Sequence, residues 1–209
     1  MKNIESDAVR VIGISGSLRG KSISRMAVEI ALKGAAEVGA ETRMLDLRQY
    51  HLTFSEEEWE TKVPSANVVQ MRQDVKQAHG LILGTPEYHG SYSGILKYAL
   101  DLMRFEEIEG KMIGLVGVSG GKMGATDALT SLRAVGRALH AWVVPEQVSI
   151  SEAWRQFETD GRIRDLRLEG ALKDVGRQVA RFAYLHNSEQ AREFLRAWES
   201  APPNPGGQR

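Results

Sequence analysis

The sequence contains no cysteine, and several other features that would narrow its function are missing as well. Without cysteine there are no disulfide bonds, thiolate nucleophiles or cysteine-ligated metal clusters, which fits a reducing compartment. The 27 basic and 27 acidic residues balance, which argues against a nucleic-acid surface. No apolar run approaches the roughly 20 residues that cross a bilayer, and the charged start MKNIESDAVR does not resemble a signal peptide. We therefore expect a soluble cytoplasmic protein that binds neither membranes nor nucleic acids.

Apolar runs and amphipathic stretches alternate along most of the chain. Strands are expected at residues 9–15, 41–47, 80–85, 112–118 and 142–145, with 148–150 as a candidate extension of the last one, and helices between and after them. Strands that alternate with helices predict an α/β fold, with a parallel sheet covered by helices on both faces. Residues 1–200 are expected to form one domain and 201–209 a disordered tail. The long polar segment at 48–64 is expected to be a lid or an interface arm.

The segment VIGISGSLRGKSISR, residues 11–25, places a polar loop between a strand and a helix. The first turn of a helix has unpaired N–H groups and the positive end of the helix dipole, so this order of elements favours an anion. Hydroxyl donors and a guanidinium that suit phosphate oxygens are also present: Ser17, Ser22, Ser24 and Arg19. The segment predicts a phosphate site, although ordinary strand-to-helix turns share the pattern.

Two familiar nucleotide patterns come close to this loop without matching it. Gly20-Lys21-Ser22 ends the triphosphate-binding pattern, but the required first glycine is Ser15. A P-loop hydrolase would also need an aspartate after another strand to hold Mg²⁺, and neither GLILGT nor MIGLVGVS supplies one. The glycines do not form the dinucleotide pattern G-x-G-x-x-G either. These mismatches favour a terminal monophosphate held by side chains and backbone together.

Two more polar loops follow later strands. In the loop that begins at Thr85, Pro86 fixes the backbone, Gly90 permits close approach and Tyr88 offers a flat face. This loop suits the edge of a planar ring, and equally a turn with a buried tyrosine. The loop SGGKMG, residues 119–124, has glycines that let backbone N–H groups approach ring carbonyl oxygens. Ligands of open α/β sheets bind at the carboxyl edge, where these loops are expected to meet.

Together, GSLRGKSISR, TPEYHGSYSGILKYALD and VSGGKMG resemble the NAD(P)H-dependent FMN reductase family of the flavodoxin-like superfamily, over residues 9–150. That family includes quinone, chromate and azo-dye reductases. The resemblance implies a flavodoxin-like three-layer sandwich with a five-stranded parallel sheet in the order 2-1-3-4-5. It also implies bound FMN, NADPH or NADH as co-substrate, and a homodimer or homotetramer. The reaction implied is hydride transfer to FMN and then to a small acceptor by a ping-pong mechanism.

The resemblance also assigns site residues. Positions that hold the FMN phosphate are Ser17, Arg19, Ser22 and Ser24. Positions that border the isoalloxazine ring are Pro86, Glu87, Tyr88, His89 and Gly90. Positions along the pyrimidine side are Ser119, Gly120, Gly121 and Gly124. Because the flavin performs the chemistry, we expect no catalytic side chain, and the histidines show no metal-ligand spacing.

Several residues depart from the family pattern. His89 stands where the family usually has Asn, and Ser93 where it usually has Pro. Backbone contacts to the flavin should survive both changes, and the pKa range of histidine would suit a proton relay at position 89. Glu87 is expected to bond to local backbone or to a neighbouring subunit rather than to act in catalysis.

The main alternative to a reductase is a flavodoxin-type one-electron carrier. Such carriers tend to be acidic, so that they dock on basic partners, whereas this chain has no net charge. Direct oxidation of NAD(P)H distinguishes the two, because a carrier should show almost none.

Overall fold

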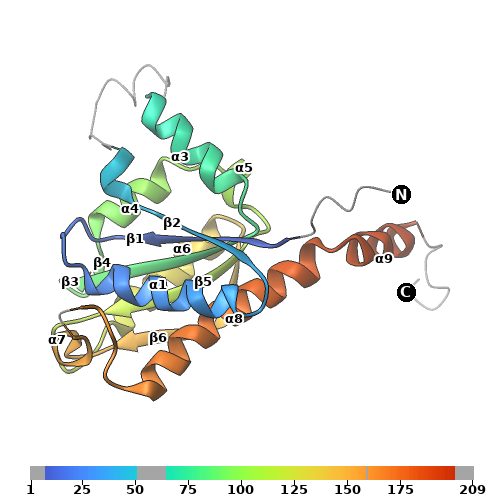
Figure 1. Cartoon of the computed structure of the whole chain (residues 1–209). Coiled ribbons are helices and arrows are strands. Elements are labelled where there is room, and N and C mark those ends of the chain that lie inside the picture. Colours follow the sequence, from blue (N-terminus) through green and yellow to red (C-terminus); the bar gives the residue numbers. More distant parts are fainter. Residues whose placement is uncertain (1–7, 51–64, 159, 201–209) are drawn as a thin grey trace, which may run out of the picture.

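The computed structural model describes residues 8–50, 65–158 and 160–200, and its centre is a parallel sheet (Figure 1). The strands are β1 (Arg10–Ser15), β2 (Glu41–Leu45), β3 (Gly80–Tyr88), β5 (Met112–Val118) and β6 (Trp142–Ile150). They lie in the order β2-β1-β3-β5-β6, and every neighbouring pair is parallel. This confirms the expected five parallel strands and their order. The short strand β4 (Ser91–Tyr92), antiparallel to the end of β3, was not predicted.

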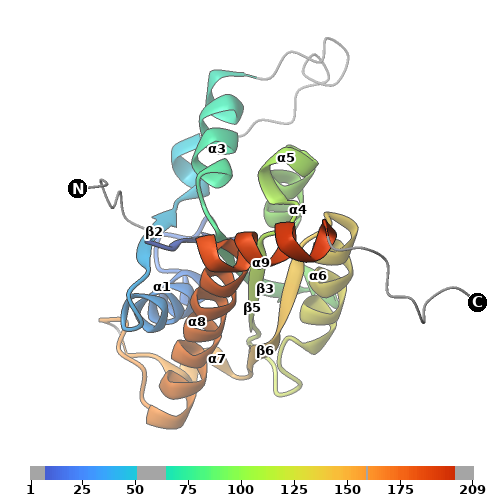
Figure 2. The same ribbon diagram turned by 90° about the vertical axis from the view of Figure 1, so that its right-hand side faces the viewer.

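Helices cover both faces of the sheet and give the expected three layers (Figures 1 and 2). One face carries α1 (Ile23–Ala36) and α8 (Leu166–Asn187), whose apolar side chains form one core cluster with the sheet. The other face carries α3 (Ala66–Lys76), α4 (Gly94–Asp101), α5 (Phe105–Ile108) and α6 (Thr126–Ala138), which form the second cluster. A Cβ on Gly176 of α8 would collide with the carbonyl group of Ala31 in α1, so these two helices pack backbone against backbone.

The last strand is longer than predicted. Where the sequence suggested a break after Pro145, β6 continues to Ile150, and its pairing with β5 shifts register between Ile113 and Leu115. Proline is tolerated there because, among the described strands, β6 pairs with β5 alone, and Pro145 lies at the irregularity. The segment after β6 contains the short helix α7 (Ala153–Gln156). The short helix α5 was not predicted.

Serine side chains cap two of the helices. The Ser65 hydroxyl accepts from Val68 N at the start of α3, and the Ser188 hydroxyl accepts from Ala191 N at the start of α9 (Glu189–Glu199). Helix α9 projects away from the sheet (Figure 1). None of the helices that the structure describes is long and apolar enough to cross a membrane. Most of the expected lid or arm, residues 51–64, and the tail at 201–209 lie outside the described residues, and η1 (Leu47–Tyr50) is the described part nearest to them.

Candidate functional site

The loop after β1 and the hairpin of β3 and β4 enclose a cavity of about 450 Å³ at the carboxyl edge of the sheet. This volume lies within the range of small-molecule sites in proteins. The lining residues are Gly16, Ser17, Leu18, Arg19, Tyr88, Ser93, Gly94 and Ile95. Of the residues assigned from the sequence, the structure thus brings Ser17, Arg19 and Tyr88 together around one cavity.

Arg19 and Tyr88 both line this cavity, and the Arg19 guanidinium lies over the Tyr88 ring. The guanidinium carbon of Arg19 lies 5.9 Å from the centre of the Tyr88 ring, close enough for a cation–π contact. Arg19 is exposed, and Tyr88 is 43% exposed. The Ser17 hydroxyl accepts from Arg19 N at 3.4 Å, which closes a tight turn in the loop. The cavity therefore combines a cation and a hydroxyl group with an accessible aromatic face.

The serines at the start of α1, Ser22 and Ser24, are not among the residues that line the cavity. Ser22 is buried, and its hydroxyl accepts from Arg25 N at 3.2 Å, so it caps the helix. Ser24 is also buried, in the first turn of α1. A phosphate contact by either hydroxyl remains a prediction.

Ser15, the last residue of β1, is buried, and its hydroxyl has no hydrogen-bond partner among the described residues. Buried hydroxyl groups are almost always paired, so this orphan marks a spare donor where the loop begins. The first-turn N–H groups of α1 and the exposed guanidinium of Arg19 add further donors at the same end of the sheet. This donor set fits the phosphate group that the resemblance implies.

The hairpin places two of the predicted ring-loop residues in its turn. Tyr88 pairs with Ser91, so His89 and Gly90 are the two turn residues, with φ of 52° and 76°. Two-residue hairpin turns with positive φ at both positions strongly prefer Asn-Gly. Gly90 is therefore required by the turn itself, and His89 occupies a position that suits asparagine better.

Glu87 lies in the part of β3 that pairs with β4, and its carboxylate reaches a neighbouring helix. Its Oε2 accepts from the backbone N–H of Ala128 at 3.0 Å. Helix α6 has no capping side chain of its own, because its N-cap residue is Ala125. The sequence predicted a bond to local backbone or to a neighbouring subunit, whereas the partner in the structure is the backbone of α6, 41 residues along the chain. Pro86, the neighbouring residue, is buried opposite Val118 of β5.

The third predicted loop lies beside the hairpin, since it follows the strand that neighbours β3, but its residues do not line the cavity. Backbone bonds tie it to the end of β6: Ser119 N donates to Ile150 O at 2.8 Å, and Glu152 N donates to Gly121 O at 2.9 Å. A Cβ on Gly124 would come within 2.5 Å of the Ser149 hydroxyl, so this glycine serves the packing of the loop. Added Cβ atoms at Gly120 and Gly121 would meet no neighbouring element, which leaves their backbone accessible.

Sequence reasoning missed the residues that hold the first two loops together. Ser93 entered the analysis only as a departure from the family pattern, although a serine before an apolar helical stretch is a capping signal. That signal predicts the cap of α4, but nothing in the pattern predicts the bond from Ser93 to Gly16. Among the described residues, no three His, Asp or Glu side chains gather as metal ligands would.

Comparison with known proteins agrees with this geometry. The family model "NADPH-dependent FMN reductase" matches residues 9–155. The chain is 29% identical to the NADPH-dependent FMN reductase ArsH of Shigella flexneri over 186 residues, which cover 87% of this chain and 71% of that protein. It is 33% identical to an NAD(P)H-dependent FMN reductase of Pseudomonas aeruginosa over 165 residues, or 77% of this chain and 87% of that protein.

Solved structures show the same fold. The flavoenzyme NAD(P)H:(acceptor) oxidoreductase FerB of Paracoccus denitrificans superposes with a TM-score of 0.66 at 21% identity, covering 83% of this chain and 98% of that one. The flavodoxin-like architecture is therefore shown by structure, and the reductase assignment by the sequence matches. The chain belongs to the NADPH-dependent FMN reductase family, and it is accordingly an oxidoreductase that uses FMN and NAD(P)H.

Proposed function

We propose that the cavity between the first loop and the β3–β4 hairpin is the FMN site of this reductase. The observation that carries the proposal is the position of Arg19 opposite Tyr88, which sets phosphate-binding donors beside an exposed aromatic face. In this arrangement Arg19 and Ser17 bind the phosphate, with the first turn of α1 behind it. The backbone of the His89-Gly90 turn and of Gly120-Gly121 follows the edge of the ring.

In the proposed reaction, NAD(P)H gives a hydride to the bound cofactor, and the electrons then pass to a small acceptor. Bound FMN supplies the redox chemistry, and the protein supplies position and access. The exposure of Tyr88 and Arg19 supports a site that is open on one side. Donor and acceptor would use this open side in turn, which gives a ping-pong mechanism. Quinones, free flavins, azo dyes and metal oxyanions are the acceptor classes that fit an open flavin face.

Replacing Arg19 by alanine tests the site directly. We expect Arg19→Ala to weaken FMN binding roughly 10- to 100-fold, because a hydrogen bond to a charged group contributes about 1.5–3 kcal/mol. The binding of riboflavin, which lacks the phosphate, should change less than about three-fold. Quenching of flavin fluorescence on titration of the apoprotein measures both affinities.

Arg137→Ala is the matched control. It removes the same charge from an exposed position in the last turn of α6, and Arg137 does not line the cavity. It should leave both affinities unchanged. Equal losses of FMN and riboflavin affinity in Arg19→Ala would show that Arg19 does not contact the phosphate, and the proposed orientation would be wrong.

We also propose a cytoplasmic enzyme that forms a homodimer or homotetramer. The NAD(P)H that the reaction consumes is a cytoplasmic metabolite, which supports the location. The exposed aromatic side chains of α9, Phe194 and Trp198, support association between copies, because isolated apolar faces of this kind favour burial.

A further inference from the structure

The loop after β1 and the β3–β4 hairpin come from different strands, yet one buried side chain joins them. Ser93 follows β4 and is 3% exposed. Its hydroxyl donates to the carbonyl oxygen of Gly16 at 2.6 Å, across 77 residues of sequence. The Ser93 hydroxyl oxygen also accepts from Leu96 N at 3.4 Å, which caps α4.

Gly16 is held on both sides by these contacts. Its N–H donates to Gly84 O at 2.8 Å, and its carbonyl oxygen accepts the bond from Ser93. A Cβ at position 16 would collide with the Ser93 hydroxyl and lie 2.7 Å from the Cβ of Leu96. Because Ser17 follows immediately, the two fixed peptide groups at Gly16 set where the phosphate-binding part of the loop begins.

The backbone of Ser93 is also fixed. Its N–H donates to the Thr85 hydroxyl at 2.9 Å, and that hydroxyl donates to Pro86 O at the same distance. Thr85 is completely buried. The base of the hairpin and the start of the phosphate loop are therefore parts of one hydrogen-bond chain, Pro86 to Thr85 to Ser93 to Gly16. Chains of this kind are stiffer than isolated bonds and costly to leave half satisfied.

The bonds of Ser93 to Thr85 and Gly16 depend on groups that a proline at this position would lack. The backbone of Ser93, with φ of −66°, would accept a proline. Proline has neither an N–H group for Thr85 nor a hydroxyl group for Gly16. The link between the two loops therefore depends on the serine at this position.

We propose that Ser93 is a positioning residue of the FMN site, which couples the phosphate loop to the ring loop through Gly16 and Thr85. This inference rests on the proposed function, since it takes the cavity to be the FMN site. Ser93 acts by fixing the distance between the two loops, so that both loops can contact the same FMN molecule. Its loss should therefore lower FMN affinity more than it lowers protein stability.

The test compares FMN affinity and apoprotein stability in matched variants. Ser93→Ala should weaken FMN binding about ten-fold, as expected when a buried carbonyl loses its partner and the loop it fixes is released. Ser188→Ala is the control, because the buried Ser188 hydroxyl caps α9 by accepting from Ala191 N at 3.2 Å, and α9 projects away from the sheet (Figure 1). Both variants lose a helix cap, but only Ser93→Ala should lose FMN affinity. Ser93→Thr keeps the hydroxyl and should bind FMN within about two-fold of the parent protein.

Two further variants make the outcome decisive. Ser93→Pro keeps the backbone angle, so the protein should fold. It removes the bonds to Thr85 and Gly16 and the cap of α4, so it should bind FMN at least as weakly as Ser93→Ala. In an Arg19→Ala background, Ser93→Ala should lower FMN affinity by less than about three-fold, because a loop without Arg19 already binds the phosphate weakly. Parental FMN affinity in Ser93→Ala or Ser93→Pro would overturn the coupling while leaving the FMN site intact. If the parent apoprotein itself fails to bind FMN, the proposed function and this inference both fail.

Discussion

His89 holds a backbone conformation that its side chain disfavours. With φ of 52° it lies in the left-handed region, and it shares the tight hairpin turn with Gly90. Asparagine tolerates this conformation better, because its short polar side chain bonds locally to the backbone. Asn-Gly is the preferred pair for such a turn, so histidine at the first position carries a strain that asparagine would reduce.

The structure predicts that His89→Asn stabilises the protein. We expect the free energy of unfolding of the apoprotein to rise by about 0.5–1 kcal/mol, measured by urea denaturation. His89→Ala, which removes the imidazole without adding a residue suited to positive φ, should give no gain. A His89→Asn protein less stable than the parent would mean that the imidazole makes contacts that outweigh the strain.

At the scale of elements, a buried carboxylate joins β2, η1 and α3. Asp74 of α3 accepts two hydrogen bonds from Arg43 of β2, at 2.8 and 3.1 Å, and one from the Tyr50 hydroxyl at 2.5 Å. Burial raises the pKa of Asp74, but the bonds from Arg43, Tyr50 and Gln70 together outweigh it and hold the pKa below its ordinary value. Burial and the bond to Asp74 raise the pKa of Tyr50 to about 12. The network fixes the last described residues before position 51.

This network should stabilise the protein in a pH-dependent way. The pKa of Asp74 is lower in the folded state, so its contribution is complete above about pH 4, the ordinary range of aspartate, and is lost as the pH falls further. Asp74→Asn should therefore cost about 2 kcal/mol at pH 7, and the difference from the parent should shrink below pH 4. Urea denaturation of both proteins from pH 7 to pH 3 measures this difference.

Asp101→Asn is the control for this series. Its carboxylate pairs with Lys97 on the surface, where both side chains are about 40% exposed, and such pairs contribute little. We expect less than about 0.5 kcal/mol at any pH. A cost for Asp74→Asn that stays constant down to pH 3 would contradict the lowered pKa.

For the whole molecule, strand order and layers followed from pattern and family resemblance, whereas the links between loops did not. The strands were predictable because buried parallel strands are continuous apolar runs, as in GLILGT. The two-residue strand β4 and the four-residue helix α5 are too short to produce a period. The bonds from Ser93 to Gly16 and from Glu87 to α6 join distant parts of the chain, and no local pattern encodes them.

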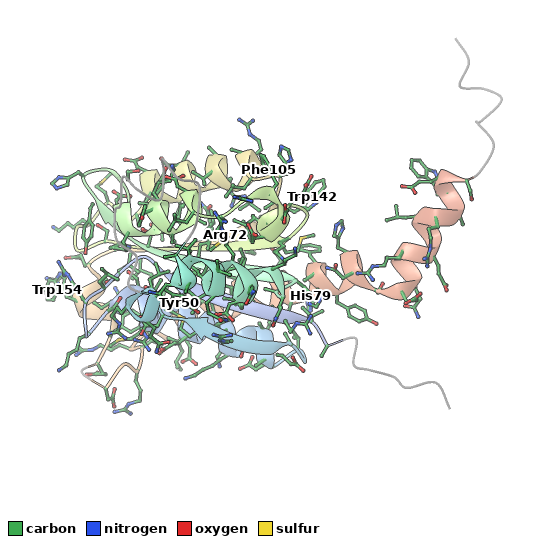
Figure 3. All side chains as sticks on the ribbon, turned by 90° about the horizontal axis from the view of Figure 1, so that it is seen from above. Tyr50, Arg72, His79, Phe105, Trp142 and Trp154 are labelled. Atoms are coloured by element: carbon green, nitrogen blue, oxygen red, sulfur yellow. The ribbon has the colours of Figure 1, made fainter. Side chains whose placement is uncertain are left out.

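Helix α9 bears on the assembly of the whole molecule. None of its residues is buried, and Phe194, Leu195 and Trp198 expose an apolar surface with helical spacing. In Figure 3, Trp142 lies at the end of the sheet from which α9 projects, and Trp154 lies at the opposite end; each is 61% exposed. We expect light scattering at micromolar concentration to give the mass of a dimer or tetramer. The mass of a single chain would contradict the proposed association.

The most direct test of the account is the visible absorption spectrum of the purified protein, recorded without oxygen before and after addition of NADPH. The account predicts a flavin spectrum that bleaches on NADPH addition with no acceptor present, because a ping-pong enzyme completes its first half-reaction alone. Removal of the nicotinamide and addition of a benzoquinone should then restore the oxidised spectrum. A flavin spectrum that persists in NADPH, or no flavin spectrum even after incubation with FMN, would contradict the proposed function.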